Sequence, residues 1–469
     1  MEARPLTERF DLVTIGGGPA GYTAALRVAE LGGRAAIVEE QAAGGNCVQH
    51  NCIPTMIMLD TLESAARAQR LGVAGILATG EGLPAFNRAV ARKQQLVQAM
   101  TNGIRTQLRL RKVEFLHGRA RLERPGLIAA ALNDGATVTL ECRAVLVATG
   151  ARPDIPAIPG LDPNAILTAD AALRLTLVPE SLLVLGGAAG PAFVLEFAQL
   201  FAGFGSRVTL ILEDDVMLPG EERAFGEALS GALGAAGVET LTGARLVSVV
   251  SSAAGHAALV QTGSGRREIA VAAICAPDRR RPYWADLGLE ALQPRQENGA
   301  LVVDEHGETS IAGVFAAGDV SGGPMTSQAA AQAGRVVGEH VMGRRTHRDD
   351  RFLPRAIFTD PEFAAVGVTE DGAKAAGRQV RSGSADLLGN ARALTMGQRE
   401  GAVKVVADAD SGQILGVHVL GPGAGELIGQ AVLAMRLEAT VDDLAAVSHW
   451  HPTLAESLTE AARRATGDA

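Results

Sequence analysis

Apolar residues in the N-terminal third of the chain occur in short, β-branched runs that suit buried parallel strands. Such runs occupy residues 10–15, 35–38 and 145–150. A small-residue turn and a helical stretch follow the first run, and a second series of strand, turn, helix and strand spans residues 181–212. Strands that alternate with helices predict the α/β class, here with two Rossmann-like dinucleotide-binding domains.

Changes in composition mark two domain boundaries. Three prolines between residues 153 and 159 predict an extended linker, and the charged residues 344–351 indicate a final boundary. Beyond it strands and helices are mixed, which predicts a C-terminal α+β domain. The strands include residues 402–407 and 414–420, and the helices include residues 425–437 and 455–465.

The turn after the first strand reads Gly-Gly-Gly-Pro-Ala-Gly, and a helix is expected from Tyr22 to Leu31. Glycines permit a tight turn and a close approach of the backbone to a pyrophosphate, which a helix N-terminus attracts. An acid at the end of the next strand can accept from ribose hydroxyls. The series predicts a site for the ADP half of a dinucleotide. Its expected contacts are Gly16, Gly18, Pro19, Ala20, Gly21, Glu39 and Glu40.

A second turn, at residues 186–191, reads Gly-Gly-Ala-Ala-Gly-Pro, so alanine and proline replace two glycines of the fingerprint. We interpret it as a nicotinamide site, with Gly186 in the turn and Glu213 at the end of the next strand. An acid there favours an unphosphorylated ribose, and hence NAD over NADP. Two other interpretations stay open: a Rossmann-like domain kept for structure, and an exposed acidic turn without a ligand.

Cys47 and Cys52 lie in the stretch that most strongly indicates a catalytic site. An undistorted helix, rising about 1.5 Å per residue, would hold their Cα atoms farther apart than the roughly 4.4–6.8 Å that a disulfide tolerates. We therefore expect a distorted helix between them. Pro54 fits the first turn of the continuing helix, which would place both sulfurs at a positive N-terminus that lowers a thiol pKa. The pair is interpreted as redox-active.

Two alternatives for the cysteines are inert thiols, or half of a zinc site with His50 between them. Cys142 and Cys275 are isolated in the sequence and offer no second ligand pair. We therefore expect no metal site.

The 469 residues carry a formal net charge of −9. Three arginines at residues 279–281 form the basic run that stands out, and we interpret it as a turn with a solvated face, so no nucleic-acid partner is expected. We see no signal peptide and no apolar run of membrane-spanning length, and we expect a soluble, cytoplasmic protein without a membrane partner. In that reducing compartment a disulfide is more often catalytic than structural.

Several further motifs occur in a recognisable order. They are Ala-Thr-Gly at 148–150, Ala-Ala-Gly-Asp at 316–319, Phe-Thr-Asp-Pro-Glu at 358–362 and His-Trp-His-Pro-Thr-Leu-Ala-Glu at 449–456. Together with the fingerprint and the cysteines, they resemble the flavin-dependent pyridine nucleotide-disulfide oxidoreductases, most closely the dihydrolipoamide dehydrogenases among them. The resemblance covers nearly the whole chain. It implies an FAD domain at 1–150, an NAD domain at 151–278, a central segment at 279–345 that completes the FAD domain, and a dimerisation domain at 346–469.

The resemblance also implies a role for each site residue. Cys47 would exchange with substrate, Cys52 would lie next to the flavin, His451 would be the general base, and Glu456 would orient it. In such enzymes the histidine comes from the other subunit, so a homodimer is implied. Electrons would pass from a dithiol, on a lipoylated carrier protein or a small molecule, through the disulfide to FAD and then to NAD. The further cofactor contacts implied are Gly45, Asn46, Thr149, Gly150, Gly318 and Asp319.

The chain departs from the family pattern around the flavin. Asn46 stands where relatives have threonine, and Met56 replaces a lysine that pairs with a glutamate corresponding to Glu196, which is expected to lack that partner. The turn at 186–191 and residues 275–279 are altered as well. Our hypothesis is that NAD reduction is slow, or that another acceptor has replaced NAD.

Two alternative functions follow from the same residues. One is a mercuric reductase or another flavoprotein disulfide reductase, although the chain ends without the vicinal cysteines usual in mercuric reductases. The other is a non-catalytic flavoprotein that serves as a redox sensor or as a subunit, with impaired nicotinamide binding. The carrier, the direction of the reaction and the acceptor are not decided by the sequence.

Overall fold

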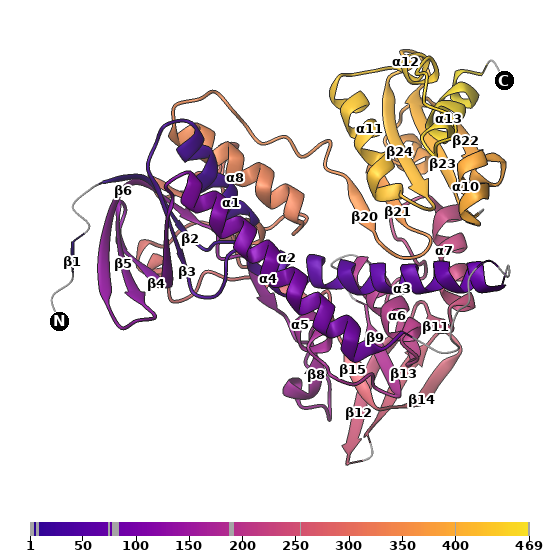
Figure 1. The fold of residues 1–469 in the computed structure, drawn as a ribbon, viewed down its shortest axis with the longest axis horizontal. Coiled ribbons are helices and arrows are strands. Elements are labelled where there is room, and N and C mark those ends of the chain that lie inside the picture. The colour runs from indigo at the N-terminus through magenta and orange to yellow at the C-terminus, as the bar shows by residue number, and fades with distance from the viewer. Residues whose placement is uncertain are drawn as a thin grey trace. The chain divides into compact units, whose positions relative to one another are not determined.

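The computed structural model describes residues 4–5, 9–73, 76, 84–186, 192–253, 255–398 and 400–467 (Figure 1). The chain divides into two compact units. The first comprises Met1–Ile57, Ala91–Asp154 and Arg279–Asp350, and the second comprises Met58–Val90, Ile155–Asp278 and Arg351–Ala469. The cysteine stretch and the first glycine turn therefore belong to one unit.

The first unit is built on a mainly parallel sheet. Strand β2 (Phe10–Ile15) pairs in parallel with β3 (Ala35–Glu39) and β6 (Thr137–Val147). The sheet continues in parallel through β4 (Glu114–Arg124) and β19 (Val314–Ala316), while β5 (Leu127–Leu132) pairs antiparallel with β4 and β6. Buried Leu12, Val13 and Val145 make this sheet the centre of the core, as their apolar runs predict.

Helices α1 (Pro19–Glu30) and α8 (Ser327–Val341) run side by side on this sheet (Figure 1). α1 begins at Pro19, three residues before the expected start, because a proline at the first helical position has a suitable φ and needs no N–H partner. A Cβ on Gly334 of α8 would lie 2.1 Å from the Ala20 carbonyl oxygen of α1. The absence of a side chain on Gly334 therefore permits the contact between these helices.

The second unit contains a parallel sheet in the order β11 (Val238–Leu241), β10 (Arg207–Ile211), β9 (Ser181–Leu185), β15 (Ala273–Cys275) and β8 (Ile166–Leu167). Helix α6 (Ala192–Gly203) packs on it through the fully buried Phe197 and Phe201. An antiparallel sheet of β12 (Arg245–Ser252), β13 (Gly255–Thr262) and β14 (Gly265–Val271) lies in the same unit. The second Rossmann-like arrangement is thus present.

The C-terminal residues of the second unit form an antiparallel sheet with helices. Its strands run in the order β20 (Arg355–Ile357), β21 (Phe363–Gly367), β24 (Ile414–Leu420), β23 (Ala402–Asp408) and β22 (Val380–Asp386). Helices α11 (Ala424–Arg436) and α13 (Glu456–Thr466) pack against these strands. The expected α+β domain is confirmed, and with it the fold class.

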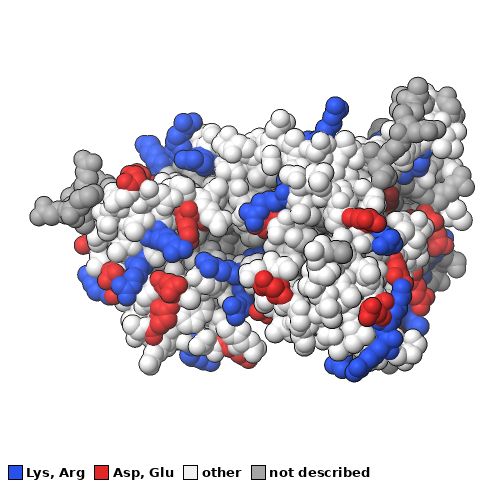
Figure 2. All heavy atoms as spheres, turned by 90° about the horizontal axis from the view of Figure 1, so that it is seen from below, with Lys and Arg blue, Asp and Glu red and all other residues white. Residues whose placement is uncertain are grey.

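On the face drawn in Figure 2, basic and acidic side chains are interspersed and separated by uncharged surface. Within the described ranges, no helix is both long enough and apolar enough to span a bilayer.

The close contact between α1 and α8 gives a stability prediction. Gly334→Ala should destabilise the protein by about 1–3 kcal/mol, because the new methyl group overlaps the Ala20 backbone. Gly103→Ala is the matched control, since Gly103 is an exposed residue of α4 (Phe86–Leu110) and its Cβ would meet nothing within 4 Å. The free energy of unfolding of the Gly103→Ala variant should rise by roughly 0.5–1 kcal/mol. Denaturant unfolding midpoints that move in the same direction for both variants would refute this account.

Candidate active site

The two cysteines lie on successive helices. Cys47 belongs to α2 (Gly45–Gln49), and Cys52 is the first residue of α3 (Cys52–Val73). Between the helices, the N–H groups of His50 and Asn51 both donate to the Asn46 carbonyl oxygen at 2.9 Å. The distortion expected from the cysteine spacing is therefore confirmed, and it lets the two sulfurs meet.

The two thiols share a hydrogen bond that separates their pKa values. Both are free and partly buried. The hydrogen bond from Cys52 lowers the pKa of Cys47 to about 7, although burial opposes this shift. The pKa of Cys52 is raised, first because its proton is held by Cys47 and then by burial. The reduced pair thus carries one thiolate near neutral pH, and the expectation of a lowered thiol pKa holds for Cys47 but is wrong for Cys52.

The cysteine stretch packs against the first glycine turn. Gly44 donates its N–H to the Gly17 carbonyl oxygen at 2.9 Å, and a Cβ on Gly45 would lie 2.6 Å from the Gly18 Cα. Gly16 has φ +110°, where a Cβ would strike the Ala148 carbonyl oxygen. Within the described chain, no side chain caps α1 at Gly18. The first turn of α1 therefore offers uncapped N–H groups of the kind that bind a pyrophosphate.

The two acids after β3 differ in position. Glu39 accepts from the Gly17 N–H at 2.6 Å and from the Gln41 N–H at 2.7 Å, so its carboxylate lies at the glycine turn. Glu40 instead forms an ion pair with Arg119 at 2.7 Å. The structure brings Glu39 to the predicted dinucleotide site and directs the Glu40 side chain elsewhere.

A largely buried arginine approaches the cysteine stretch from β16 (Arg280–Pro282). Arg280 donates from Nη1 to Asn46 Oδ1 at 3.2 Å, donates to the Ala151 carbonyl oxygen, and lies 4.0 Å from an Asp319 carboxylate oxygen. Its side chain is only 12% exposed. The sequence interpretation of this arginine run as a solvated turn is therefore wrong for Arg280, whose burial no local pattern revealed.

The remaining predicted contacts lie on the same side of the first unit. Thr149 donates its hydroxyl to the Tyr283 carbonyl oxygen at 2.5 Å, and Gly150 follows with φ +71°. Gly318, with φ +82°, leads into η3 (Asp319–Ser321). Burial raises the pKa of Asp319, while the nearby Arg280 opposes that shift.

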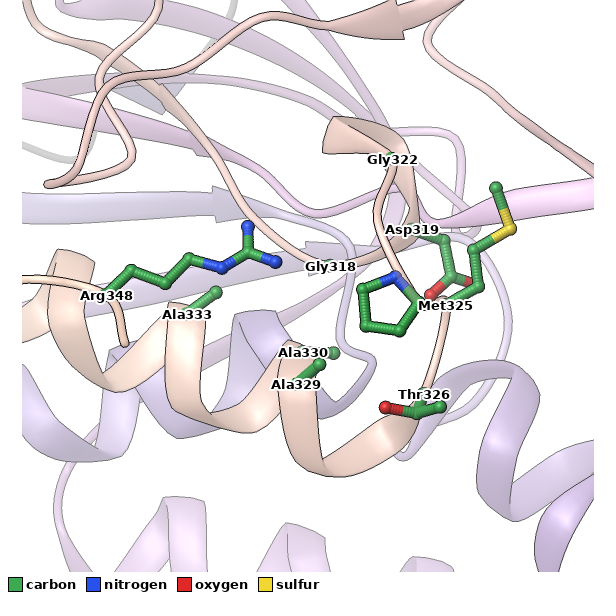
Figure 3. A pocket seen from close by; sticks show the side chains of 10 residues that line it. Gly318, Asp319, Gly322, Met325, Thr326, Ala329, Ala330, Ala333 and Arg348 are labelled. Carbon is green, nitrogen blue, oxygen red and sulfur yellow. The ribbon is translucent and has the colours of Figure 1, made fainter. Parts of the chain in front are cut away.

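A hollow lies between the residues that follow β19 and the first turns of α8 (Figure 3). Ala329, Ala330 and Ala333 of α8 form one wall, and Asp319 and Arg348 bring opposite charges to it. Several buried polar atoms of the first unit find no hydrogen-bond partner among the described residues. They include Asn51 Oδ1, Thr55 Oγ1, Arg280 Nε and Thr326 Oγ1. A small-residue wall, partly buried charges and unsatisfied polar atoms fit a large polar cofactor such as FAD.

His451 and Glu456 form a pair near the C-terminus. Glu456 Oε1 lies 2.9 Å from His451 Nδ1, and its other oxygen accepts from the Thr453 N–H at 2.8 Å. These two hydrogen bonds, that of Thr453 first, lower the pKa of Glu456. The carboxylate thus fixes the ring through Nδ1 and leaves Nε2 to exchange a proton. The His451 side chain is 71% exposed.

The predicted nicotinamide contacts are only partly described. Gly186 follows β9 and donates its N–H to the Ile211 carbonyl oxygen at 2.8 Å, and Glu213 is exposed after β10. Residues 187–191 of the altered turn lie outside the described residues. Met56 leaves Glu196 without the lysine that pairs with it in relatives. The buried Glu196 carboxylate instead accepts from the Phe358 N–H at 2.9 Å, a contact that the sequence did not predict.

A cysteine pair packed against the glycine turn of a dinucleotide site is typical of flavin-dependent disulfide oxidoreductases. Sequence comparison identifies the family. The pyridine nucleotide-disulphide oxidoreductase family matches residues 10–334, and the dimerisation domain of that family matches residues 353–462. The chain belongs to this family.

Individual relatives agree with this assignment. The chain is 32% identical to a dihydrolipoyl dehydrogenase of Bacillus subtilis, over 99% of both chains. It is 37% identical to one of Thermus scotoductus, over 97% of this chain and 96% of the relative. Among solved structures, LpdA of Mycobacterium tuberculosis superimposes with a TM-score of 0.88 at 30% identity, over 97% of this chain and 99% of LpdA.

A second solved structure is the Cu(II) complex of the HOCl-induced flavoprotein disulfide reductase RclA of Escherichia coli. Its TM-score is 0.85 at 26% identity, over 98% of this chain and 100% of RclA. The chain is therefore a flavoprotein disulfide oxidoreductase that uses FAD and NAD(H), as the sequence motifs predicted, and its dimerisation domain supports a homodimer.

The hydrogen bond between the thiols predicts how Cys47 titrates. In the dithiol-reduced protein, iodoacetamide should alkylate Cys47 with a pH midpoint of about 7. Cys52→Ala removes the donor, so the midpoint should rise toward the ordinary thiol value of about 8.5. Cys52→Ser keeps a donor and should give a smaller rise. A Cys52→Ala midpoint that stays near that of the wild-type protein would contradict the shared hydrogen bond.

Proposed function

We propose that the protein is a dihydrolipoamide dehydrogenase, which oxidises the dihydrolipoyl group of a carrier protein with NAD as the final acceptor. The observation that carries the proposal is the Cys47 and Cys52 pair, whose single thiolate near neutral pH lies against the glycine turn of a dinucleotide site. The names of the curated relatives support the choice of substrate. The two other cysteines are buried free thiols, which suits a reducing compartment such as the cytoplasm.

The cysteines exchange with the substrate in two steps. A substrate thiolate attacks Cys47 Sγ, the disulfide between Cys47 and Cys52 breaks, and its electron pair leaves on Cys52. The second substrate thiolate then attacks the substrate sulfur of the mixed disulfide and releases Cys47. The lipoyl group leaves as a cyclic disulfide, and the enzyme keeps two electrons in a reduced cysteine pair.

His451 takes the protons of the substrate thiols at Nε2, and the Glu456 carboxylate stabilises the resulting imidazolium. Both His451 and the neighbouring Trp450 are largely exposed, the latter at 85%. Such exposure suits a surface that the second copy of the chain covers, from which His451 would reach the partner subunit's cysteine pair.

The first unit supplies the groups that would hold FAD. The uncapped first turn of α1 would bind the pyrophosphate, Glu39 a ribose, and Asp319 with the alanine wall of α8 the remaining part of the cofactor. FAD supplies the redox chemistry that links the reduced cysteines to NAD. The residues assigned to these contacts are Gly16, Gly18, Pro19, Ala20, Gly21, Glu39, Gly45, Asn46, Thr149, Gly150, Gly318 and Asp319.

A second candidate is a flavoprotein disulfide reductase with a substrate other than lipoamide. The hydrogen bond between Arg280 and Asn46, next to the exchanging cysteine, favours it, because Asn46 stands at a point where the chain departs from the family pattern. The likeness to RclA is compatible with this candidate.

Turnover with dihydrolipoamide and NAD tests the first proposal. The purified flavin-loaded enzyme should form NADH, and dihydrolipoamide alone should bleach its visible spectrum. Cys47→Ser should abolish both, because no disulfide can form. A wild-type enzyme that is not reduced by dihydrolipoamide, yet oxidises NADH with another disulfide, would support the second candidate. No reaction with any acceptor would indicate a non-catalytic flavoprotein.

The pair of His451 and Glu456 gives a kinetic prediction. Glu456→Gln keeps the size of the side chain but removes the charge that stabilises the imidazolium, so kcat with dihydrolipoamide should fall at least about tenfold. Glu460→Gln on the same helix is the control, since Glu460 forms an exposed ion pair with Arg464 at 3.0 Å, and its kcat should match that of the wild-type enzyme. Equal rates for all three enzymes would remove Glu456 from the mechanism.

A further inference from the structure

Helix α8 begins at the cysteine pair with a hydroxyl side chain. Ser327 is its first residue, and the Ser327 Oγ lies 3.6 Å from Cys52 Sγ. The same hydroxyl is within hydrogen-bond reach of Cys47. Ser327 was not among the site residues expected from the sequence.

The first turn of α8 adds to the polarity of this position. Thr326 is the N-cap, but its hydroxyl makes no capping bond and finds no partner in the described part of the chain. The uncapped N–H groups of a 15-residue helix therefore begin where the Ser327 hydroxyl meets the sulfurs. Both features stabilise negative charge.

Three other titratable groups also interact with the pair. Asp319 of η3 raises the pKa of Cys47, Arg280 of β16 interacts with Cys52, and Tyr22 of α1 interacts with Cys47. The carboxylate opposes a thiolate and the guanidinium favours one. Ser327 differs from Asp319 and Arg280 because its hydroxyl is neutral, and this hydroxyl can rotate between the two sulfurs.

We propose that Ser327 donates its hydrogen bond to whichever sulfur of the pair carries the negative charge. In the reduced pair the acceptor is the Cys47 thiolate. When substrate attacks Cys47 and the disulfide breaks, the electron pair passes to Cys52, and the hydroxyl turns to this leaving thiolate. The assignment rests on the redox role proposed for the two cysteines, and Ser327 acts as a positioning residue for both.

Thiol titration tests the role of Ser327 without turnover. The flavin-loaded protein is reduced with dithiothreitol, and alkylation of Cys47 by iodoacetamide is followed by mass spectrometry across pH. Ser327→Ala should raise the pH midpoint by about one unit, which is tenfold less thiolate at a pH below the midpoint. Ser321→Ala is the control, because the Ser321 hydroxyl donates to the Gly318 carbonyl oxygen at 2.9 Å and should leave the midpoint unchanged.

A second pair of variants isolates the hydroxyl group. Ser327→Thr keeps it, and Ser327→Val has the same shape without it, so only the valine variant should show the raised midpoint. In a Cys47→Ser background, Ser327→Ala should likewise raise the midpoint of Cys52, the leaving sulfur. Equal midpoints for the threonine and valine variants, or a Ser327→Ala midpoint equal to that of the wild-type protein, would overturn the proposal. If the wild-type enzyme does not oxidise dihydrolipoamide, that result contradicts the proposed substrate and leaves the role of Ser327 to the thiol titration.

Discussion

One proton shared by two sulfurs is the interaction on which the candidate site depends. The shared hydrogen bond requires that the sulfurs of Cys47 and Cys52 lie close together, and a continuous helix would hold them apart. The double hydrogen bond to the Asn46 carbonyl oxygen ends one helix and lets the next begin at Cys52. The backbone break thus sets the chemistry, because it gives the reduced pair a single charge near neutral pH.

Backbone contacts of Gly44 and Gly45 with the glycine turn before α1 fix where the cysteine pair lies. Gly44 bonds to Gly17 and Gly45 fits against Gly18, at distances that leave no room for side chains. These contacts place the cysteines beside the uncapped N-terminus of α1. A thiol pair and a pyrophosphate site are then neighbours, an arrangement that suits electron transfer from sulfur to a bound dinucleotide.

The sequence predicted the features that depend on near neighbours. The helix break follows from the spacing of Cys47 and Cys52, and the tight turn follows from the glycines before α1. Contacts between distant residues were missed: Arg280 with Asn46 spans 234 positions, Ser327 with Cys52 spans 275, and Glu196 with Phe358 spans 162. Apolar periodicity indicates which elements are buried, but it does not indicate which polar atoms meet once they pack. For the same reason a run of three arginines was interpreted as solvated, although its middle member, Arg280, is largely buried.

The most direct measurement is the redox state of the four cysteines in the flavin-loaded enzyme purified in air. Free thiols would be blocked under denaturing conditions, and the peptides mapped by mass spectrometry before and after reduction. The account predicts that Cys47 and Cys52 escape the block as one disulfide, while Cys142 and Cys275 are modified fully. Modification of all four cysteines before reduction, or a disulfide between any other two, would contradict it.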